Sequence, residues 1–422
     1  MHREERQSSN PYRTHDAGEL RAENAGERVR LAGWVHRRRD HGGLIFIDLR
    51  DRWGLTQITF DPDRRDVFAA AERLRPEWSI SVEGEVVRRP EGNENPGLPT
   101  GEIEVEATDL RVLNESETPP FEIDRDRPVD ELLRLRYRYL DLRRPRMRDN
   151  IVFRHRVVKH MRDYLSGRGF VEIETPLLTR SSPEGARDYL VPSRLYPGQF
   201  YALPQSPQQF KQLLMVAGFE RYFQVARALR DEDQRGDRQP EHTQLDLEMS
   251  YTTQDEVLDL VEGLYVEIVE QLTDKKILHK PFPRLTYAEA MDRFGSDKPD
   301  IRFGLELADV SEIARSSEFK VFRGAVESGG SVRGIAVGSL GDLSRGHVEG
   351  EITDVARAGG ARGLAYLKVE EEGLSGSIAR FFSPEEQAAL REALAAETGD
   401  YMFFVADKDP VVFESLGRLR LY

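Results

Sequence analysis

The chain has 422 residues, of which 39% are hydrophobic, and its formal net charge at pH 7 is -14. A chain of this length and apolar content can bury a sizeable core, so the composition predicts a globular protein of about two to four domains. The sequence contains no cysteine, which excludes disulfides, thiolate zinc sites and cysteine nucleophiles and leaves oxygen ligands, such as those of Mg²⁺, for any metal.

No apolar run approaches the roughly 20 residues that span a bilayer, and the N-terminal sequence MHREERQSSNPY has no signal-peptide core. We therefore expect a cytoplasmic protein without a membrane partner. The negative net charge disfavours binding of nucleic acid over the whole surface. Residues 28–52 are an exception, because they carry seven arginines against three aspartates. This basic segment is a candidate binding face.

Short alternating segments between residues 29 and 106, separated by Gly and Pro turns, predict five strands with an amphipathic helix, DRRDVFAAAERLR, after the third. This order is typical of an OB-type barrel, although another small closed β-barrel fits the pattern equally well. Residues 114–147 begin with prolines and continue with many arginines, which predicts a linker running into a short helix.

The segment that follows alternates helices and strands. Apolar residues at helical spacing predict a helix over 151–165, which is followed by a strand that ends at Pro176, a strand QFYALP and a helix SPQQFKQLLMVAGF. Two strands, ERYFQVARAL and HTQLDLEMSYT, flank a charged loop, and the helix QDEVLDLVEGLYVEIVEQL comes next. The pattern predicts an antiparallel sheet with helices. A separate α/β alternation from about residue 305 to 409 predicts an inserted or appended domain.

The charged loop and its flanks, RALRDEDQRGDRQPEHTQLD (227–246), hold four arginines and six acids. A solvated ladder of salt bridges explains most hairpins of this kind. Here, however, Arg230 lies at the end of an apolar strand and directly precedes Asp231, Glu232 and Asp233. A guanidinium offers a planar fork to phosphate oxygens and carboxylates hold a hard cation, so the grouping predicts a site for a polyphosphate and its metal.

The hairpin resembles motif 2 of the class II aminoacyl-tRNA synthetases, in the form found in bacterial aspartyl-tRNA synthetases. Four further segments resemble parts of the same family in the same order along the chain. GWVHRRRDHGGLIFIDLRDRWG resembles the anticodon-binding barrel, GFVEIETP resembles motif 1, SSPEGARDYLVPSR resembles the loop that closes over the amino acid, and YALPQSPQQFKQLLM resembles the aspartate-recognition segment. The resemblance runs from about residue 13 to the end of the chain.

The resemblance implies an α+β multidomain fold with an N-terminal OB-fold β-barrel. It implies an anticodon-binding domain over 1–113, a hinge over 114–147, a class II catalytic domain with an antiparallel sheet over 148–304, a GAD-type insertion domain over 305–409, and a return toward the catalytic core over 410–422. The implied reaction is that of an aspartate-tRNA ligase, in which ATP with Mg²⁺ activates L-aspartate and the aspartyl group passes to tRNA(Asp), with tRNA(Asn) open as a second acceptor. The implied assembly is a homodimer with Pro176 at its interface.

The resemblance also assigns individual roles, with no residue assigned as a metal ligand. Catalysis is assigned to Arg230 and Glu232, and binding of L-aspartate to Glu184, Ser206, Gln208, Lys211, Arg230 and Asp246. ATP binding is assigned to Arg230, Asp231, Glu232, Gln239 and His242, and anticodon binding to Arg39, His41, Phe46 and Gln57. Taken alone, Gln208 and Lys211 fit a polar helix start, Phe46 fits barrel core, and Arg37 to Arg39 fit a solvated strand edge.

The sequence departs from the family pattern in two places. His242 stands where the family has the phenylalanine on which adenine stacks; since an imidazole titrates near neutrality, we expect ATP affinity to depend on pH there, although a surface histidine without a role is equally compatible. Nothing after residue 305 resembles motif 3, whose arginine grips the γ-phosphate. We therefore expect either a fragment of a longer product or a natural truncation, with an exposed sheet edge.

Two alternative functions stand against that of an aspartate-tRNA ligase. The first is a catalytically inactive tRNA-binding or regulatory fragment of such a synthetase. The second, asparagine or lysine specificity on the same fold, is disfavoured by QSPQQFKQ together with PEGARDY. His41, in RRRDHGG, would fit the type of enzyme that charges both tRNA(Asp) and tRNA(Asn).

Overall fold

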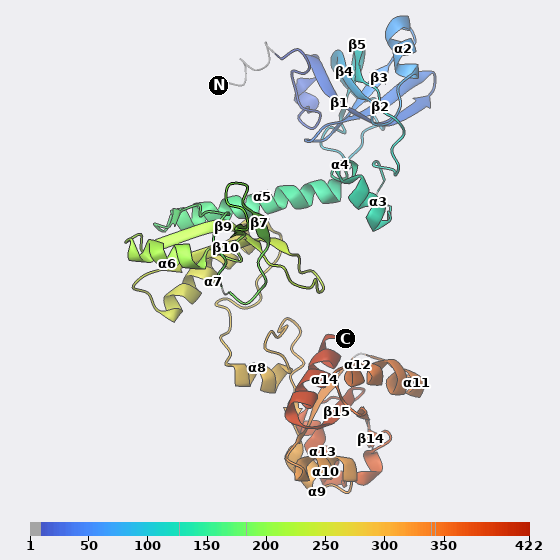
Figure 1. The fold of residues 1–422 in the computed structure, drawn as a ribbon. Coiled ribbons are helices and arrows are strands. Elements are labelled where there is room, and N and C mark those ends of the chain that lie inside the picture. Colours follow the sequence, from blue (N-terminus) through green and yellow to red (C-terminus); the bar gives the residue numbers. More distant parts are fainter. Residues whose placement is uncertain (1–9, 126, 183, 339, 342) are drawn as a thin grey trace. The chain divides into compact units, whose positions relative to one another are not determined.

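The computed structural model describes residues 10–422 except 126, 183, 339 and 342. The chain divides into two compact units, residues 1–251 and residues 252–422. Figure 1 shows the elements of each unit. Among the residues that the structure describes, no helix combines the length and the apolar character needed to cross a bilayer.

The first unit begins with a closed five-stranded barrel. Its strands follow the order β1-β2-β3-β5-β4, and all neighbours are antiparallel except β3 and β5. The five predicted strands and the helix after the third are confirmed. The elements are η1 (Ala22–Asn24), β1 (Arg28–His41), β2 (Leu44–Arg50), β3 (Leu55–Phe60), α2 (Arg65–Glu72), β4 (Ser79–Arg88) and β5 (Ile103–Asn114).

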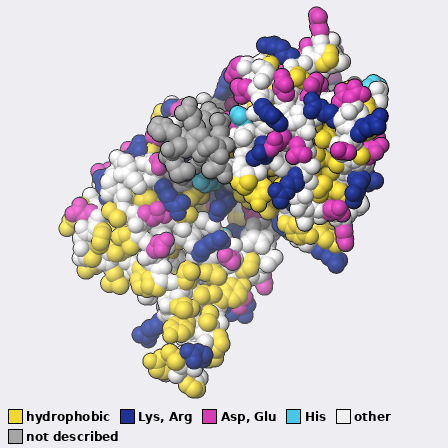
Figure 2. All heavy atoms as spheres, turned by 90° about the horizontal axis from the view of Figure 1, so that it is seen from above, with side chains coloured by type: hydrophobic (Ala, Val, Ile, Leu, Met, Phe, Trp, Pro, Cys, Tyr) yellow, Lys and Arg dark blue, Asp and Glu magenta, His cyan; other side chains and the backbone are white. Residues whose placement is uncertain are grey.

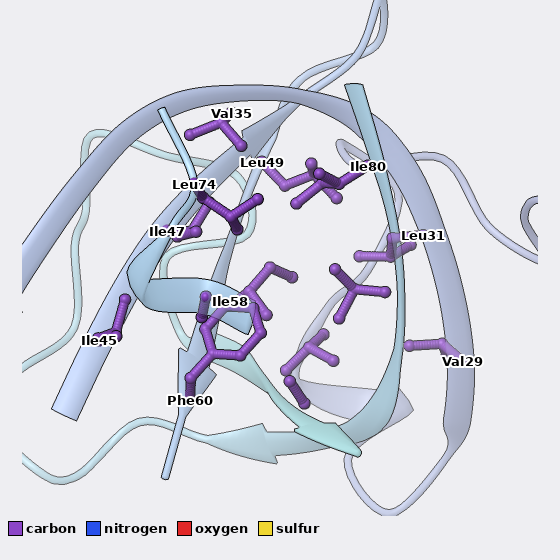
Figure 3. Packing of buried hydrophobic residues seen from close by; sticks show 14 of the residues in the cluster. Val29, Leu31, Val35, Ile45, Ile47, Leu49, Ile58, Phe60, Leu74 and Ile80 are labelled. Carbon is purple, nitrogen blue, oxygen red and sulfur yellow. The ribbon is translucent and has the colours of Figure 1, made fainter. Parts of the chain in front are cut away.

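The barrel interior is filled with aliphatic side chains, as Figure 3 shows. Along β2 the side chains of Ile45, Ile47 and Leu49 are buried, while Phe46 and Asp48 between them are only partly buried. This alternation follows from the two-residue period of a strand, which sends neighbouring side chains to opposite faces. Burial of each large aliphatic side chain contributes about 1.5–3 kcal/mol. Phe46 is therefore on the outer face of the barrel and is not part of its core.

Three helices connect the barrel to the next sheet. They are α3 (Glu131–Arg136), α4 (Arg138–Asp141) and α5 (Pro145–Ser166). Asp141 is fully buried at the end of α4, where the guanidinium groups of Arg134 and Arg138 lie within 3.0 and 2.6 Å of its oxygens. Proline at the first position of α5 suits a helix start, because its missing N–H has no partner there in any helix.

A three-stranded sheet of order β10-β9-β6 follows. The predicted antiparallel pair is confirmed as β9 and β10, whereas the predicted strand before Pro176 is paired only over β6, which lies parallel to β9. A separate two-stranded sheet joins β7 and β8. The elements are β6 (Val171–Glu172), β7 (Leu190–Pro192), β8 (Phe200–Ala202), α6 (Gln208–Val216), β9 (Arg221–Leu229) and β10 (Glu241–Met249).

The second unit contains a five-stranded antiparallel sheet of order β11-β12-β15-β13-β14, with a hydrophobic cluster on each face. The predicted α/β alternation after residue 305 is thus a single sheet with helices. The elements are α7 (Gln254–Leu272), α8 (Tyr287–Phe294), β11 (Ala308–Asp309), α9 (Ser311–Ser316), α10 (Lys320–Glu327), β12 (Ser331–Val337), α11 (Arg345–His347), η2 (Val348–Ile352), α12 (Thr353–Ala358), β13 (Ala365–Glu370), β14 (Gly373–Ser375), η3 (Ala379–Phe381), α13 (Pro384–Ala393), β15 (Tyr401–Asp407) and α14 (Asp409–Leu421).

The last helix, α14, packs on this sheet with its apolar face. Val412, Leu416 and Leu419 are buried in the same cluster as Phe403 of β15, and a return of residues 410–422 toward the catalytic core stays a prediction. Through Leu421 the helix is part of the second unit.

Candidate active site on the hairpin

The hairpin of β9 and β10 presents a polar face. In its antiparallel register Asp246 is opposite Gln224, and Glu248 is opposite Tyr222. Opposed residues of an antiparallel pair point to the same side of a sheet, and residues two apart on a strand share that side. Gln244, Asp246 and Glu248 therefore lie in a row on one face, together with Gln224 and Tyr222.

Lys211 of α6 reaches this row from the helix. Its Nζ donates to Oδ1 of Asp246 at 2.9 Å and lies 3.2 Å from Oε2 of Glu248. Lys211 and Asp246 are only 9% and 5% exposed. A buried charge requires a partner of opposite sign, and here one ammonium faces two carboxylates. The pocket is therefore richer in negative than in positive charge.

The pKa values in this cluster follow from that imbalance. Burial opposes the charge on Lys211, but hydrogen bonds and attraction from Asp246 and Glu248 outweigh it, so the pKa of the ammonium is raised. Burial also raises the pKa of the Asp246 carboxyl; Lys211 lowers it, and the nearby charges of Glu248 and Glu184 raise it further, with a net increase. The charge of Glu184 thus acts on Asp246 from a different segment of the chain.

Two buried acceptors on this face have no hydrogen-bond partner within the part of the chain that the structure describes. They are Oδ2 of Asp246 and Oε1 of Gln244. Unpaired buried polar atoms are costly and rare in folded proteins. Both atoms are acceptors, so the arrangement suits a ligand that brings hydrogen-bond donors, such as an ammonium group.

A second set of hydrogen bonds fixes the side chain of Gln224 on this face. The hydroxyl of Tyr222 donates to Oε1 of Gln224 at 2.8 Å, and Thr175 Oγ1 donates to the same oxygen at 3.0 Å. Burial is the main cause that raises the pKa of Tyr222, and the charges of Asp246 and Glu248 add to it. The phenol stays protonated and holds Gln224 in place.

Glu184 and Ser206 form a further set of contacts. Ser206 Oγ donates to Oε2 of Glu184 at 2.6 Å, and the backbone N–H of Gln208 donates to Ser206 Oγ at 3.2 Å. The structure thus brings Glu184, Ser206 and Gln208 into one set of contacts and Lys211 and Asp246 into another.

The sixth residue assigned to L-aspartate, Arg230, lies at the end of β9 in a second hollow. Arg230, Glu232, Gln239 and His242 line a cavity of about 450 Å³ together with Asp233 and other hairpin residues. The backbone of Arg230 donates to the carbonyl of Pro240 at 2.8 Å, which closes the base of the loop. His242 shares the face of Asp246, because the two are four residues apart on one strand.

Asp231 is the one residue assigned to ATP that does not line this cavity. Its backbone N–H instead donates to the carbonyl of Arg187 at 2.9 Å, which connects the hairpin to the segment that carries Glu184. Within the described residues, no group of three or more His, Asp or Glu is arranged to hold a metal ion by itself. Glu232 and Asp233 line the cavity as a pair.

Several residues of this site were missed by sequence reasoning. Glu248 is the second carboxylate on Lys211, and alternation from Asp246 in LDLEM could have identified it. Gln205 is buried and donates to Asp188 Oδ1 at 2.6 Å; its position next to Ser206 is the only signal in the sequence. Gln224 and Thr175 gave no signal, since their role depends on the pairing of β6 with β9.

The outer face of the barrel carries a second cluster. Arg39 Nη2 donates to Asp48 Oδ1 at 2.6 Å and to Gln57 Oε1 at 3.1 Å, and Gln57 Nε2 donates to Glu104 Oε2 at 2.5 Å. Phe46 is opposite Arg39 in the pairing of β1 with β2 and shares this face. The exposed His41 lies at the end of β1. The structure therefore places Arg39, Phe46 and His41 on the outside of β1 and β2, whereas Gln57 of β3 is buried beside Arg39 and is engaged at both ends of its amide.

One face of the molecule is mixed in charge. Figure 2 shows this face, on which basic and acidic side chains are intermingled and hydrophobic side chains form exposed groups. Exposed apolar residues flank Pro176, namely Val171, Leu177 and Leu178.

Comparison with known families gives two matches. Residues 130–408 match the tRNA synthetases class II (D, K and N), and residues 29–113 match the OB-fold nucleic acid binding domain. The second match decides between the two barrel types that the sequence left open, in favour of the OB fold.

Individual relatives agree with these matches. The chain is 81% identical over 415 residues to an aspartate-tRNA(Asp/Asn) ligase of Rubrobacter xylanophilus, which covers 98% of this chain and 69% of the relative. It is 56% identical to the enzyme of the same name from Halothermothrix orenii, again over 69% of that protein. Among solved structures, asparaginyl-tRNA synthetase from Pyrococcus horikoshii, complexed with asparaginyl-adenylate, matches with a TM-score of 0.56 and 19% identity over 94% of each chain. At this identity the last match supports the fold alone.

Proposed function

The chain belongs to the class II tRNA synthetases (D, K and N), and from this premise we propose that it is an aspartate-tRNA ligase. It would activate L-aspartate with ATP to aspartyl-adenylate and pyrophosphate, and then transfer the aspartyl group to the 3′ end of tRNA(Asp), with tRNA(Asn) as a second acceptor. Beyond the names of the relatives, the observation that carries the proposal is the buried Lys211–Asp246 pair, whose second carboxylate oxygen lacks a partner among the described residues.

This pair supports recognition of an amino acid that bears opposite charges at its two ends. The α-ammonium of aspartate would bind Oδ2 of Asp246, and the side-chain carboxylate would bind Nζ of Lys211. Each charge of the pair would then face the opposite charge on the substrate, so no charge is left buried without a partner. Asparagine would offer Lys211 a neutral amide in place of a carboxylate, which is the basis of discrimination.

The contacts of Glu184 and Ser206 support the same orientation. Glu184 would add a second acceptor for the α-ammonium, since its carboxylate is close enough to Asp246 to raise the pKa of that group. Ser206 holds Glu184 through a hydrogen bond of 2.6 Å, and Gln208, at the start of α6, would contact the substrate from the helix. The proposed contacts of Glu184 and Gln208 with the substrate are inferred from these hydrogen bonds.

The hairpin cavity is the proposed ATP site. Arg230 would contact the α-phosphate while the carboxylate of aspartate attacks phosphorus and pyrophosphate leaves, and it would stabilise the charge that develops on the phosphate oxygens. Glu232 and Gln239 would bind ATP, His242 would lie against the adenine, and Asp231 would keep the loop in register through its backbone. Catalysis rests on positioning and charge stabilisation, with no protein nucleophile.

Mg²⁺ fits this donor set as an ion bound chiefly through ATP. Magnesium in nucleotide sites takes one or two carboxylates and completes its shell with phosphate oxygens and water, and Glu232 and Asp233 line the cavity together with Arg230. When bound, the ion would neutralise phosphate charge as a Lewis acid. Glu232 and Asp233 are the residues that would hold it.

The barrel is the proposed anticodon reader. Phe46, Arg39 and His41 share its outer surface, Gln57 is buried beside Arg39, and unpaired bases are usually read by stacking on an aromatic ring beside arginines. We further propose a cytoplasmic homodimer through the exposed apolar residues around Pro176, and a GAD-type identity for residues 305–409.

Calorimetric titration with L-aspartate, L-asparagine and L-lysine tests substrate choice, and aspartate-dependent ATP–pyrophosphate exchange tests activation. Of the three amino acids, we expect only L-aspartate to bind. We expect aspartate-dependent ATP–pyrophosphate exchange in the parent protein and none in Arg230→Ala. Arg227→Ala is the matched control, because Arg227 is exposed and pairs with Glu241. Binding of tRNA without binding of aspartate would instead favour the inactive tRNA-binding fragment.

A further inference from the structure

The segment 184–188 buries almost no apolar side chain. Glu184, Gly185 and Arg187 are exposed, and Ala186 and Asp188 are only partly buried. A segment with few buried apolar contacts opens at low free-energy cost. Its position therefore depends on the hydrogen bonds that tie it to its neighbours.

Gln205 supplies three of these bonds from a side chain that is only 1% exposed. Its Oε1 accepts from the backbone N–H of Ala186 at 3.0 Å, and its Nε2 donates to the carbonyl of Ala186 at 2.9 Å. The remaining Nε2 hydrogen is directed to Oδ1 of Asp188 at 2.6 Å. Both donors of the amide are thus used, and Gln205 pairs with Ala186 as a peptide group of a neighbouring strand would.

The held segment touches the site on two sides. Glu184 accepts from Ser206, the residue after Gln205, and the carbonyl of Arg187 accepts from the backbone N–H of Asp231 at 2.9 Å. A hydrogen bond from Ser181, and after it the one from Gln205, lowers the pKa of Asp188 and keeps this carboxylate an acceptor. Glu184 and the hairpin are therefore both connected to Gln205 through the segment.

We propose that Gln205 is a positioning residue that docks the segment 184–188 and so places the carboxylate of Glu184 beside Asp246, where the α-ammonium of the substrate binds. The proposal rests on the proposed function for the identity of the substrate. The docking itself does not depend on it. Gln205 acts through Glu184 and does not touch the amino acid.

The consequence is a coupling between docking and affinity. When only a fraction of molecules has the segment docked, the apparent dissociation constant rises by the inverse of that fraction. Gln205→Met keeps the length of the side chain and removes all three bonds. Because all three hydrogen bonds are lost, we expect aspartate to bind at least about tenfold more weakly.

Amide hydrogen exchange on the full chain tests the docking without any substrate. We expect Gln205→Met to lose protection at the N–H of Ala186 and also at the N–H of Asp231, which Gln205 does not contact. Gln209→Met, the same change at an exposed position of α6, should change neither amide. Asp188→Ala, which removes one of the three bonds, should give a smaller loss at both positions.

Calorimetric titration of the same variants with L-aspartate completes the test. Loss of protection at Asp231 together with weaker aspartate binding, at an unchanged melting temperature, supports the proposal. Protection at Asp231 that survives in both Gln205→Met and Asp188→Ala overturns it and leaves Gln205 as a local packing residue. A parent protein that binds no aspartate would count against the proposed function, while the exchange data would still decide the docking.

Discussion

The carboxylate of Asp246 accepts a hydrogen bond from the Lys211 ammonium at 2.9 Å through one oxygen, while its other oxygen is buried without a partner among the described residues. One oxygen of this carboxylate is thus hydrogen-bonded within the protein, and the other oxygen is available to a ligand. This state is stable only because Lys211 compensates part of its charge, and it makes Asp246 the centre of the proposed amino-acid site.

Removing the cation should destabilise this site. Lys211→Met leaves Asp246 and Glu248 as two neighbouring carboxylates without a cation, and loss of one partner of a buried pair costs about 3–5 kcal/mol. We expect faster native-state hydrogen exchange across β9 and β10 and no aspartate binding. Lys320→Met, at an exposed position of α10, is the control; equal exchange in both variants would show that the pair contributes nothing.

The pKa of Asp246 should respond to its neighbours in opposite directions. Glu248 raises it and Lys211 lowers it, so Glu248→Gln should lower the pKa and Lys211→Met should raise it. Because the folded pKa lies above 3.8, the folded state binds more protons between 3.8 and that value, and the contribution of Asp246 to stability is lost as pH rises through this window. Carbon-13 NMR of labelled aspartate measures the shift; a value that Glu248→Gln leaves in place would contradict the assignment.

Phe46 should matter for tRNA and not for folding. Its side chain is on the outer face of β2, so Phe46→Ala should leave the barrel folded and weaken tRNA binding by about 1–3 kcal/mol, the usual worth of one stacked base. Phe60→Ala is the contrasting variant, because Phe60 is buried in the core and its loss should cost about 3–5 kcal/mol of stability. A Phe46→Ala barrel that unfolds would identify the residue as core.

Glu77 should hold the barrel to the hinge. This buried carboxylate accepts two hydrogen bonds from Arg50, at 2.8 and 2.7 Å, and one from Arg143 at 2.8 Å, and Arg143 also lies over the ring of Trp34. Glu77→Gln should cost about 3 kcal/mol, since it leaves two guanidinium groups without a charged partner. Denaturation followed by tryptophan fluorescence measures the loss, and Glu85→Gln, at an exposed position of β4, should cause none.

His36 should make the barrel sensitive to acid. Burial, and then the charge of Arg50, lowers the pKa of His36 below 6.5. Below pH 6.5 the unfolded chain therefore takes up a proton before the folded barrel does, so stability falls as pH decreases from 6.5 to the folded pKa. His36→Gln should flatten this part of the curve of stability against pH; an unchanged slope would exclude His36 as its source.

Much of this fold follows from local patterns, and the exceptions share one cause. The alternating segments predicted the strands of the barrel, and the helical spacing of apolar residues over 151–165 predicted α5, because a strand or a helix imposes its own period on the sequence. The parallel pairing of β6 with β9 has no local signal, and neither does the packing of α14 on β15, since both are decided by residues distant in the sequence.

The residues of the candidate active site divide in the same way, into those that the sequence predicted and those that it did not. Arg230, Lys211 and Asp246 stand in segments whose resemblance to a known family pointed to them, and the structure brings Lys211 and Asp246 into contact. Glu248 and Gln205 were not predicted, because each becomes significant only through a partner on another element. Electrostatic balance around Lys211 is a property of three segments together and cannot be read from one.

The order of strands in the second unit has a consequence for synthesis of the chain. β15 lies between β12 and β13 in the sheet, although it follows both in the sequence. While the ribosome is still translating the preceding residues, β12 and β13 are without the strand that joins them, and their unpaired edges face solvent. The sheet can close only after residues 401–407 leave the exit tunnel, so we infer that this sheet forms only once β15 has been translated.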